Sequence, residues 1–126
     1  QITPLEEVFD YYRKNKSKVF VRKIICYPSL FSKNNLEDIH KVVYDKVYDI
    51  NISDWIEAIE RKDNKPQKTD RFWCSALVGY IYTKCGVLTP YTDWSILRPS
   101  DFTTKYNNSL NFLNNACLGD EVQIHI

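Results

Sequence analysis

One stretch of the chain decides the fold: residues 70–86 read DRFWCSALVGYIYTKCG. On a helix, the apolar side chains of this stretch point in almost every direction, and a helix of that kind belongs in a protein interior. Gly86 follows as a helix-ending residue, because glycine readily adopts the left-handed conformation that closes many helices. The stretch therefore predicts a central buried helix that begins near Cys74 and ends just before Gly86.

Three shorter helices are predicted before this one. Residues 4–15 form the first, with Thr3 as its cap and its apolar side chains on one face. Residues 33–46 form the second, capped by Ser32, and residues 53–61 form the third. The chain has only three glycines and five prolines, which argues against a linker-rich or low-complexity chain and for a folded one.

Two strands and one further helical turn complete the predicted elements. Residues 18–27 alternate, but both sets of side chains are partly apolar, so this strand is expected to be interior and covered on both faces. Residues 109–117 are expected to form a last helical turn, and residues 121–126 an edge strand. The order of elements predicts an α+β fold with few strands and one central helix.

The length, composition and net charge of the chain limit the kinds of protein that it can be. Its 126 residues leave room for one domain, and 44% hydrophobic with 26% charged residues is ordinary for a globular chain. A net charge of +1 gives no basic excess, so nucleic-acid binding is not expected. The densest basic stretch, residues 61–68, is expected to be a solvated loop. No apolar run approaches the roughly 18 residues of a transmembrane helix, so no membrane span is expected.

The chain has four cysteines, which are Cys26, Cys74, Cys85 and Cys117. No two of them form a Cys-x-x-Cys pair and there are only two histidines, so no metal site is expected. An even number would allow two disulfides. However, three of the four lie in apolar runs, as buried thiols do, which favours free thiols and a reducing, cytoplasmic compartment.

Cys74 is the candidate nucleophile, because it lies in the first turn of the predicted buried helix. The start of a helix presents N–H groups without intrahelical partners and a partial positive charge of about half an elementary charge. That environment stabilises a thiolate, and the same N–H groups can hold the oxyanion that forms when a carbonyl is attacked. Thr69 or Asp70 could cap this helix. The alternative is a packed thiol that only fills space, since small buried cysteines are common.

The residues around Cys74 resemble the nucleophile helix of the circularly permuted papain-like thiol hydrolases. This superfamily includes bacterial cell-wall peptidases, acyltransferases that act on lipids, and homologues in large DNA viruses. Its pattern is an aromatic residue, Cys-Ser, an aliphatic pair and a later glycine. Here these are Trp73, Cys74-Ser75, Leu77-Val78 and Gly86.

Further matches lie in order on both sides, so the resemblance spans roughly residues 3–126. They are the strand with its Val-Arg core at residues 19–24, Tyr48-Asp49 after a helix, Trp94, and the Pro-x-Asp-Phe pattern at residues 99–102. Taken as residues alone, Trp94 is expected to belong to the core, and Asp101, after Ser100, is expected to be a turn or cap residue.

The resemblance implies a single permuted papain-like domain over residues 1–126, in which the helix carrying Cys74 packs on a small antiparallel sheet. It also implies that Tyr48 lines the substrate site, although a phenol in the core fits Tyr48 equally well. No cofactor or metal is implied.

Two departures limit what the resemblance carries over. Ala76 stands where members often have glutamate. The permutation also places the catalytic histidine upstream, so the sequence, which begins at Gln1 without an initiator methionine, is expected to lack its histidine-bearing N-terminal segment. Neither His40 nor His125 matches that motif. His40 is expected to be a surface residue, and His125, on the predicted edge strand, is expected to have no functional role.

Two functions remain open at this point. The first is a cysteine hydrolase or acyltransferase that acts on a peptide, amide or lipid-ester substrate through an acyl-Cys74 intermediate. The second is a catalytically inactive structural or interaction domain, for example a component of a large DNA virus particle with other virion proteins as partners. A histidine on a strand upstream of Gln1 would favour the first, and its absence from the full gene would favour the second.

Overall fold

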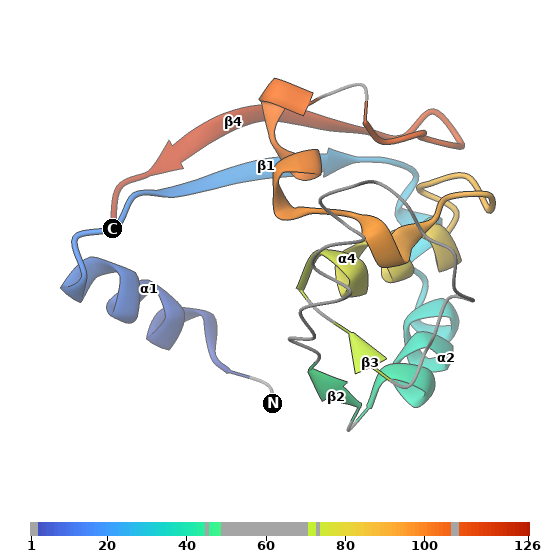
Figure 1. Ribbon diagram of the computed structural model, residues 1–126, viewed down its shortest axis with the longest axis horizontal. Coiled ribbons are helices and arrows are strands. Elements are labelled where there is room, and N and C mark those ends of the chain that lie inside the picture. The colour runs from blue at the N-terminus through green and yellow to red at the C-terminus, as the bar shows by residue number, and fades with distance from the viewer. Residues whose placement is uncertain (1–2, 45, 49–70, 73, 107–108) are drawn as a thin grey trace. The chain divides into compact units, whose positions relative to one another are not determined.

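A computed structural model describes residues 3–44, 46–48, 71–72, 74–106 and 109–126 of the chain. Over these residues the protein is a mixed α+β structure, as predicted from the sequence (Figure 1). The helices are α1 (Leu5–Lys14), α2 (Lys33–Val43) and α4 (Cys74–Lys84), and the strands are β1 (Val19–Ile25), β2 (Val47–Tyr48), β3 (Arg71–Phe72) and β4 (Cys117–Ile124). The predicted helix over residues 53–61 and the predicted loop at residues 61–68 lie outside the described residues.

The chain divides into two compact units. The terminal unit consists of Gln1–Ile25 together with Leu118–Ile126, and the central unit is the uninterrupted stretch Cys26–Cys117. Every buried apolar residue of the described ranges belongs to the central unit: Ile39, Ala76, Tyr80, Cys85, Val87, Leu88, Trp94, Leu97, Leu110 and Ala116. The hydrophobic core of the described chain is therefore the core of the central unit.

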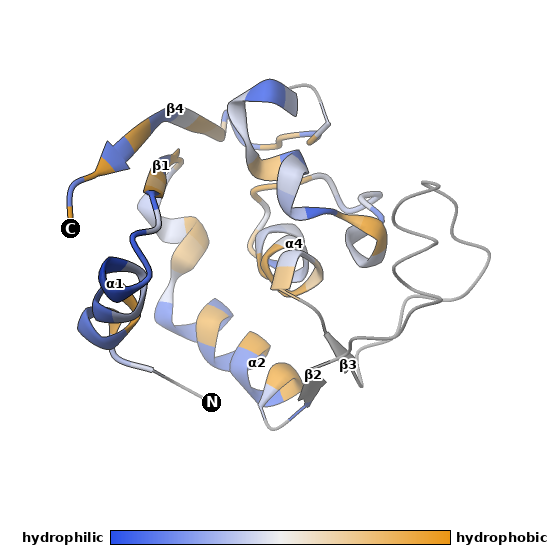
Figure 2. Ribbon diagram, turned by 60° about the vertical axis from the view of Figure 1, so that its left-hand side comes forward, coloured by the Kyte–Doolittle hydropathy of each residue, from blue (hydrophilic) through white to orange (hydrophobic). Residues whose placement is uncertain are grey.

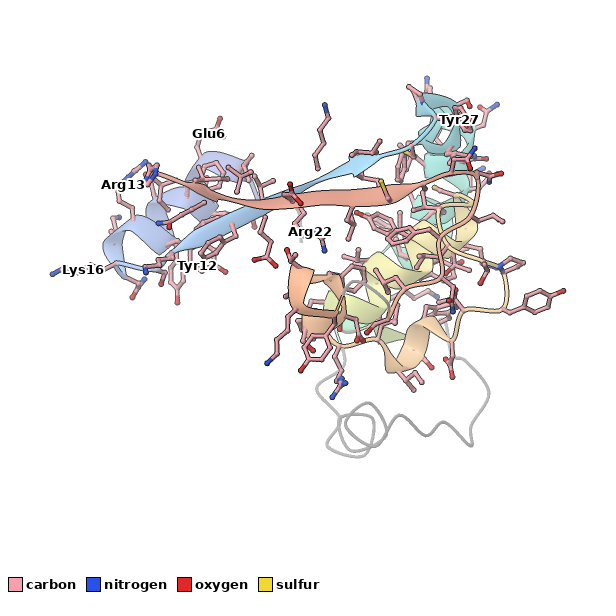
Figure 3. The ribbon with its side chains drawn as sticks, turned by 90° about the horizontal axis from the view of Figure 1, so that it is seen from above. Glu6, Tyr12, Arg13, Lys16, Arg22 and Tyr27 are labelled. Carbon is pink, nitrogen blue, oxygen red and sulfur yellow. The ribbon has the colours of Figure 1, made fainter. Side chains whose placement is uncertain are left out.

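The terminal unit is built on a two-stranded ribbon in which β1 and β4 run antiparallel (Figure 1). Arg22 fastens the two strands, because its Nε donates to the Gly119 carbonyl at 2.6 Å and its Nη2 donates to the Leu118 carbonyl at 3.1 Å (Figure 3). The prediction of an interior β1 is wrong, since Phe20 and Val21 are both exposed. In the described part of this unit β1 pairs with β4 alone, and a two-stranded ribbon cannot cover both of its own faces.

Helix α1 confirms the predicted first helix but begins one residue later than expected. Pro4 rather than Thr3 occupies the cap position, and no side chain bonds the first turn. Acidic Glu6 and Glu7 in that turn complement the positive end of the helix dipole. Figure 2 shows that hydrophilic residues dominate this helix, and none of its residues is buried.

Helix α4 confirms the central prediction from the sequence. It begins at Cys74 and ends at Lys84, and Gly86 follows in the left-handed conformation with φ +79°. Its buried residues, however, share one side of the helix: Ser75, Ala76, Gly79 and Tyr80. Leu77 and Ile81 are half-buried. One side of α4 is therefore buried, whereas the rest of the helix is half-buried or exposed.

Helix α2 confirms the second predicted helix and its cap. The Ser32 hydroxyl accepts a hydrogen bond from the Asn35 N–H at 3.3 Å, which satisfies one of the free donors at the helix start. The helix ends at Val43, three residues before the predicted end, and it places Ile39 in the core. Ile39 thus holds α2 in the central unit.

The predicted helical turn over residues 109–117 is wrong. Leu113 N–H donates instead to the Val87 carbonyl at 2.8 Å, and Phe112 forms an antiparallel bridge with Leu88. Asn114 and Asn115 then take φ values of +54° and +56°. Asparagine tolerates this left-handed conformation, which is incompatible with a right-handed helix. The chain turns there and enters β4 at Cys117, four residues before the predicted start of that strand.

Candidate active site

The candidate nucleophile lies where the buried helix of the central unit meets solvent. Cys74 is the first residue of α4 and is exposed, whereas Ser75 and Ala76, which follow it, are only 4% and 2% exposed. The beginning of an α-helix carries N–H groups that no intrahelical carbonyl accepts. The fold therefore presents a thiol to solvent at a helix start while the residues behind it anchor the helix in the core.

Ser75 fixes this helix start to the following part of the chain. Its hydroxyl donates to the Leu97 carbonyl at 2.6 Å, and both residues are buried. Leu97 is the C-cap of the short 3-10 helix Trp94–Ile96. One buried hydrogen bond therefore joins the first turn of α4 to the end of this 3-10 helix. The position of the Cys74 backbone thus depends on Ser75, a side chain that the sequence marks only as part of the Cys-Ser motif.

Close packing continues along the buried side of α4. A Cβ atom at Gly79 would lie 2.5 Å from Leu97 Cδ1 and 3.1 Å from Trp94 Cβ, so any larger residue at this position requires the buried Leu97 side chain to shift. One residue on, the Tyr80 ring meets the Trp94 indole edge to face, with centroids 5.1 Å apart. Trp94 is 5% exposed, which confirms the prediction that it belongs to the core.

Arg98 and Asp101 form a reciprocal backbone clamp directly after Leu97. The Arg98 N–H donates to Asp101 Oδ2 at 2.8 Å, and the Asp101 N–H donates to the Arg98 carbonyl at 3.0 Å. These bonds open the 3-10 helix Pro99–Phe102, and Asp101 is 1% exposed. The prediction that Asp101 is a turn or cap residue is therefore confirmed.

The backbone of Tyr48 lies beside the segment that leads into α4. Strands β2 and β3 pair in parallel, with Val47 opposite Arg71 and Tyr48 opposite Phe72, two residues before Cys74 (Figure 1). The side chain of Tyr48 and the whole of Trp73 lie outside what the structure describes. The role of Tyr48 at the substrate site therefore stays a prediction.

Both histidines are exposed, which confirms the prediction that His40 is a surface residue. The His40 ring lies in α2 with its centroid 5.2 Å from that of Tyr44, and His125 follows the end of β4 in the terminal unit. Neither arrangement identifies a base for the Cys74 thiol.

All four cysteines are thiols rather than disulfides, as predicted. Cys85, near the other end of α4, is only 3% exposed. Burial raises the pKa of the Cys85 thiol, and the neighbouring Cys26 raises it further, so Cys85 is a poor nucleophile at neutral pH. Cys74 and Cys117 are the two exposed thiols, which makes Cys117 a natural reference for the reactivity of Cys74.

Neither a metal centre nor a membrane-spanning helix is found in the described part of the chain. No three His, Cys, Asp or Glu side chains of these residues are grouped so that they could hold a metal ion. None of the described helices combines the length and the apolar character needed to cross a bilayer.

No family model, curated protein or solved structure matches the chain.

Proposed function

We propose that the chain is the cysteine-bearing part of a thiol hydrolase or acyltransferase with a permuted papain-like fold, and that Cys74 is its nucleophile. The observation that carries the proposal is the exposure of Cys74 at the first residue of a helix whose next two residues are buried. A sulfur nucleophile needs access to substrate and nearby donors that stabilise negative charge, and a helix start offers both. The ordered resemblance along the chain supports the same assignment.

The reaction would proceed through an acyl-Cys74 thioester. The thiolate attacks the carbonyl carbon of an amide or ester, and the electron pair of the C=O bond moves to the oxygen. N–H groups at the helix start can donate hydrogen bonds to the oxyanion that forms. Collapse of this intermediate breaks the C–N or C–O bond, and the leaving amine or alcohol takes a proton. Water then releases the acid in a hydrolase, whereas an acceptor alcohol or amine takes the acyl group in a transferase.

The proposal also needs a base that removes the thiol proton. The resemblance assigns this role to a histidine upstream of Gln1, and neither His40 nor His125 is proposed for it. The 126-residue chain by itself is accordingly expected to show little or no turnover. A longer chain carrying that histidine should be active, and Cys74→Ala should abolish its activity.

Alkylation by iodoacetamide tests the nucleophile directly. At neutral pH we expect Cys74 to be labelled about fivefold faster than Cys117, because both are exposed but only Cys74 lies at a helix start, where charge stabilisation of about 1 kcal/mol is available. Cys85 should be the slowest, since it is buried. The rates are measured at each cysteine by peptide mass spectrometry of quenched samples, with denatured protein as the control for intrinsic reactivity. Equal rates at Cys74 and Cys117 would contradict the assignment.

A second candidate function, a non-catalytic interaction domain, is favoured by one specific observation. Large apolar side chains of the terminal unit are exposed: Leu5, Tyr11, Tyr12, Phe20, Val21, Ile25 and Val122. Where exposed apolar side chains form a contiguous patch, that patch is typical of a surface that binds another protein. If Cys74 is labelled no faster than Cys117, this second function becomes the better proposal.

A further inference from the structure

Side-chain contacts in the central unit join the segment that follows β1, residues 26–31, to the end of α4. The Phe31 ring of this segment meets the Tyr82 ring edge to face, with centroids 6.1 Å apart. Leu30, the neighbour of Phe31, brings its Cδ2 atom to 3.8 Å from the position that a Cβ atom at Gly86 would take. The segment therefore packs against the last turn of α4 and against the glycine that follows this helix.

Cys26 and Cys85 belong to the two parts of the chain that these contacts join. Cys26 is the first residue after β1, and Cys85 immediately precedes Gly86. Burial raises the pKa of the Cys85 thiol and of the Tyr82 phenol, and the charge of Cys26 raises the pKa of each further. Because charge interactions weaken with distance, Cys26 lies near both residues, which are separated by less than one helical turn.

The two neighbouring thiols differ in their access to solvent. Cys26 is half-buried, whereas Cys85 is only 3% exposed. A dissolved oxidant can therefore reach Cys26 but has almost no surface of Cys85 to attack. Cys85 can react readily only with a sulfur that is already held beside it, and Cys26 provides that sulfur.

We propose that Cys26 and Cys85 are a redox-sensitive pair, which a low-molecular-weight disulfide such as oxidised glutathione converts to an intramolecular disulfide that stabilises the fold. The Cys26 thiolate attacks one sulfur of oxidised glutathione, so that a mixed disulfide forms and one glutathione thiolate leaves. Cys85 then attacks the Cys26 sulfur, and the second glutathione thiolate leaves. The two protons of the protein thiols pass to the two glutathione thiolates. Two protein thiols are thus oxidised while one glutathione disulfide is reduced.

The second step is possible although burial makes Cys85 a weak nucleophile. Its target is an adjacent sulfur in the same folded unit, and a reaction between two neighbouring groups proceeds at a high effective concentration. The resulting bond would close a loop of nearly half the chain. A disulfide that closes a long loop stabilises a protein mainly because it restricts the unfolded chain. The inference does not depend on a catalytic role of Cys74.

Oxidation of the 126-residue chain tests the inference. The reduced protein is incubated with oxidised glutathione, the remaining thiols are blocked with N-ethylmaleimide, and the peptides are mapped by mass spectrometry without reduction. We expect a Cys26–Cys85 disulfide to be the main bond between protein cysteines. The midpoint of urea denaturation should rise by about 1 M in the oxidised protein. Dithiothreitol should reverse both changes.

Two serine variants separate the pair from the other thiols. Cys26→Ser removes the thiol that the oxidant can reach, so Cys85 should stay reduced and oxidation should leave the urea midpoint unchanged. Cys117→Ser removes an exposed thiol outside the pair and is the matched control, so it should keep both the disulfide and the rise in midpoint.

Several results would overturn the inference. They are a disulfide that involves Cys74 or Cys117 in place of the pair, a lasting mixed disulfide at Cys26 with Cys85 still reduced, and a Cys26–Cys85 bond that forms only in urea. A bond that forms in the folded protein without raising the urea midpoint also overturns it, because the stabilising effect would then be absent. If Cys26→Ser does not fold, the peptide map and the urea midpoint of the unaltered chain decide.

Discussion

Gly79→Val is expected to lower the free energy of unfolding by about 3 kcal/mol, which is at the upper end of the usual cost of overpacking a core. The reason is steric, since even the first carbon of the new side chain would lie 2.5 Å from Leu97 Cδ1 and 3.1 Å from Trp94 Cβ. Both neighbours are buried and cannot move into solvent without loss of packing. The midpoint and slope of urea denaturation, followed by tryptophan fluorescence, measure the change.

Gly119→Val provides the matched control within the same chain. Gly119 lies in β4, where the nearest atom to an added Cβ is the backbone oxygen of Lys23, at 3.4 Å. Valine also favours strands, so this substitution should change the free energy of unfolding by less than about 1 kcal/mol. Equal stability of the two variants would show that α4 does not pack closely against the turn at Trp94.

Asp101→Ala should destabilise the protein by about 2 to 3 kcal/mol, because removal of this buried carboxylate leaves the Arg98 N–H without its acceptor. That carboxylate accepts the Arg98 N–H at 2.8 Å in a position that is 1% exposed. The loss can be followed by the same urea titration. It should be accompanied by faster amide hydrogen exchange at Arg98, because that N–H loses its protection.

Asp101→Asn distinguishes the hydrogen bond from the charge. Asparagine keeps a side-chain oxygen that can accept the Arg98 N–H, so this variant should lose less than half as much stability as Asp101→Ala. A similar loss in both variants would mean that the negative charge of Asp101, and not the hydrogen bond to the Arg98 backbone, stabilises the turn.

Much of the fold could be predicted because several elements are specified by their own residues. Helix α4 is rich in apolar residues and is followed by Gly86, and α2 begins after a serine that caps it. Elements that depend on distant partners were predicted less well. The residues of β1 are typical of an interior strand. Its exposure, however, depends on how many strands pair with it, and in the described part of the chain it pairs with β4 alone. The turn at Asn114 and Asn115 follows backbone bonds to distant residues that no local pattern indicates.

The candidate site was predicted only in part, for the same reason. Cys74 could be placed at a helix start from the sequence, but its exposure depends on which side of α4 the rest of the chain covers. The bond between Ser75 and Leu97 spans 22 residues and could not be foreseen. The bonds between Arg98 and Asp101 are indicated by the neighbouring sequence. In a turn that contains proline, an aspartate three residues after the first residue commonly accepts the N–H of that residue.

The β1–β4 ribbon has a consequence for the time course of folding. Its strands come from distant parts of the chain, so that Arg22 and Gly119 are 97 residues apart. During synthesis β1 leaves the ribosome before the whole central unit, and β4 leaves after it. Contacts so distant in sequence form slowly, because the entropy of closing the intervening loop opposes them. The central unit can therefore begin to fold while β1 still lacks its partner strand, and the ribbon is completed after it.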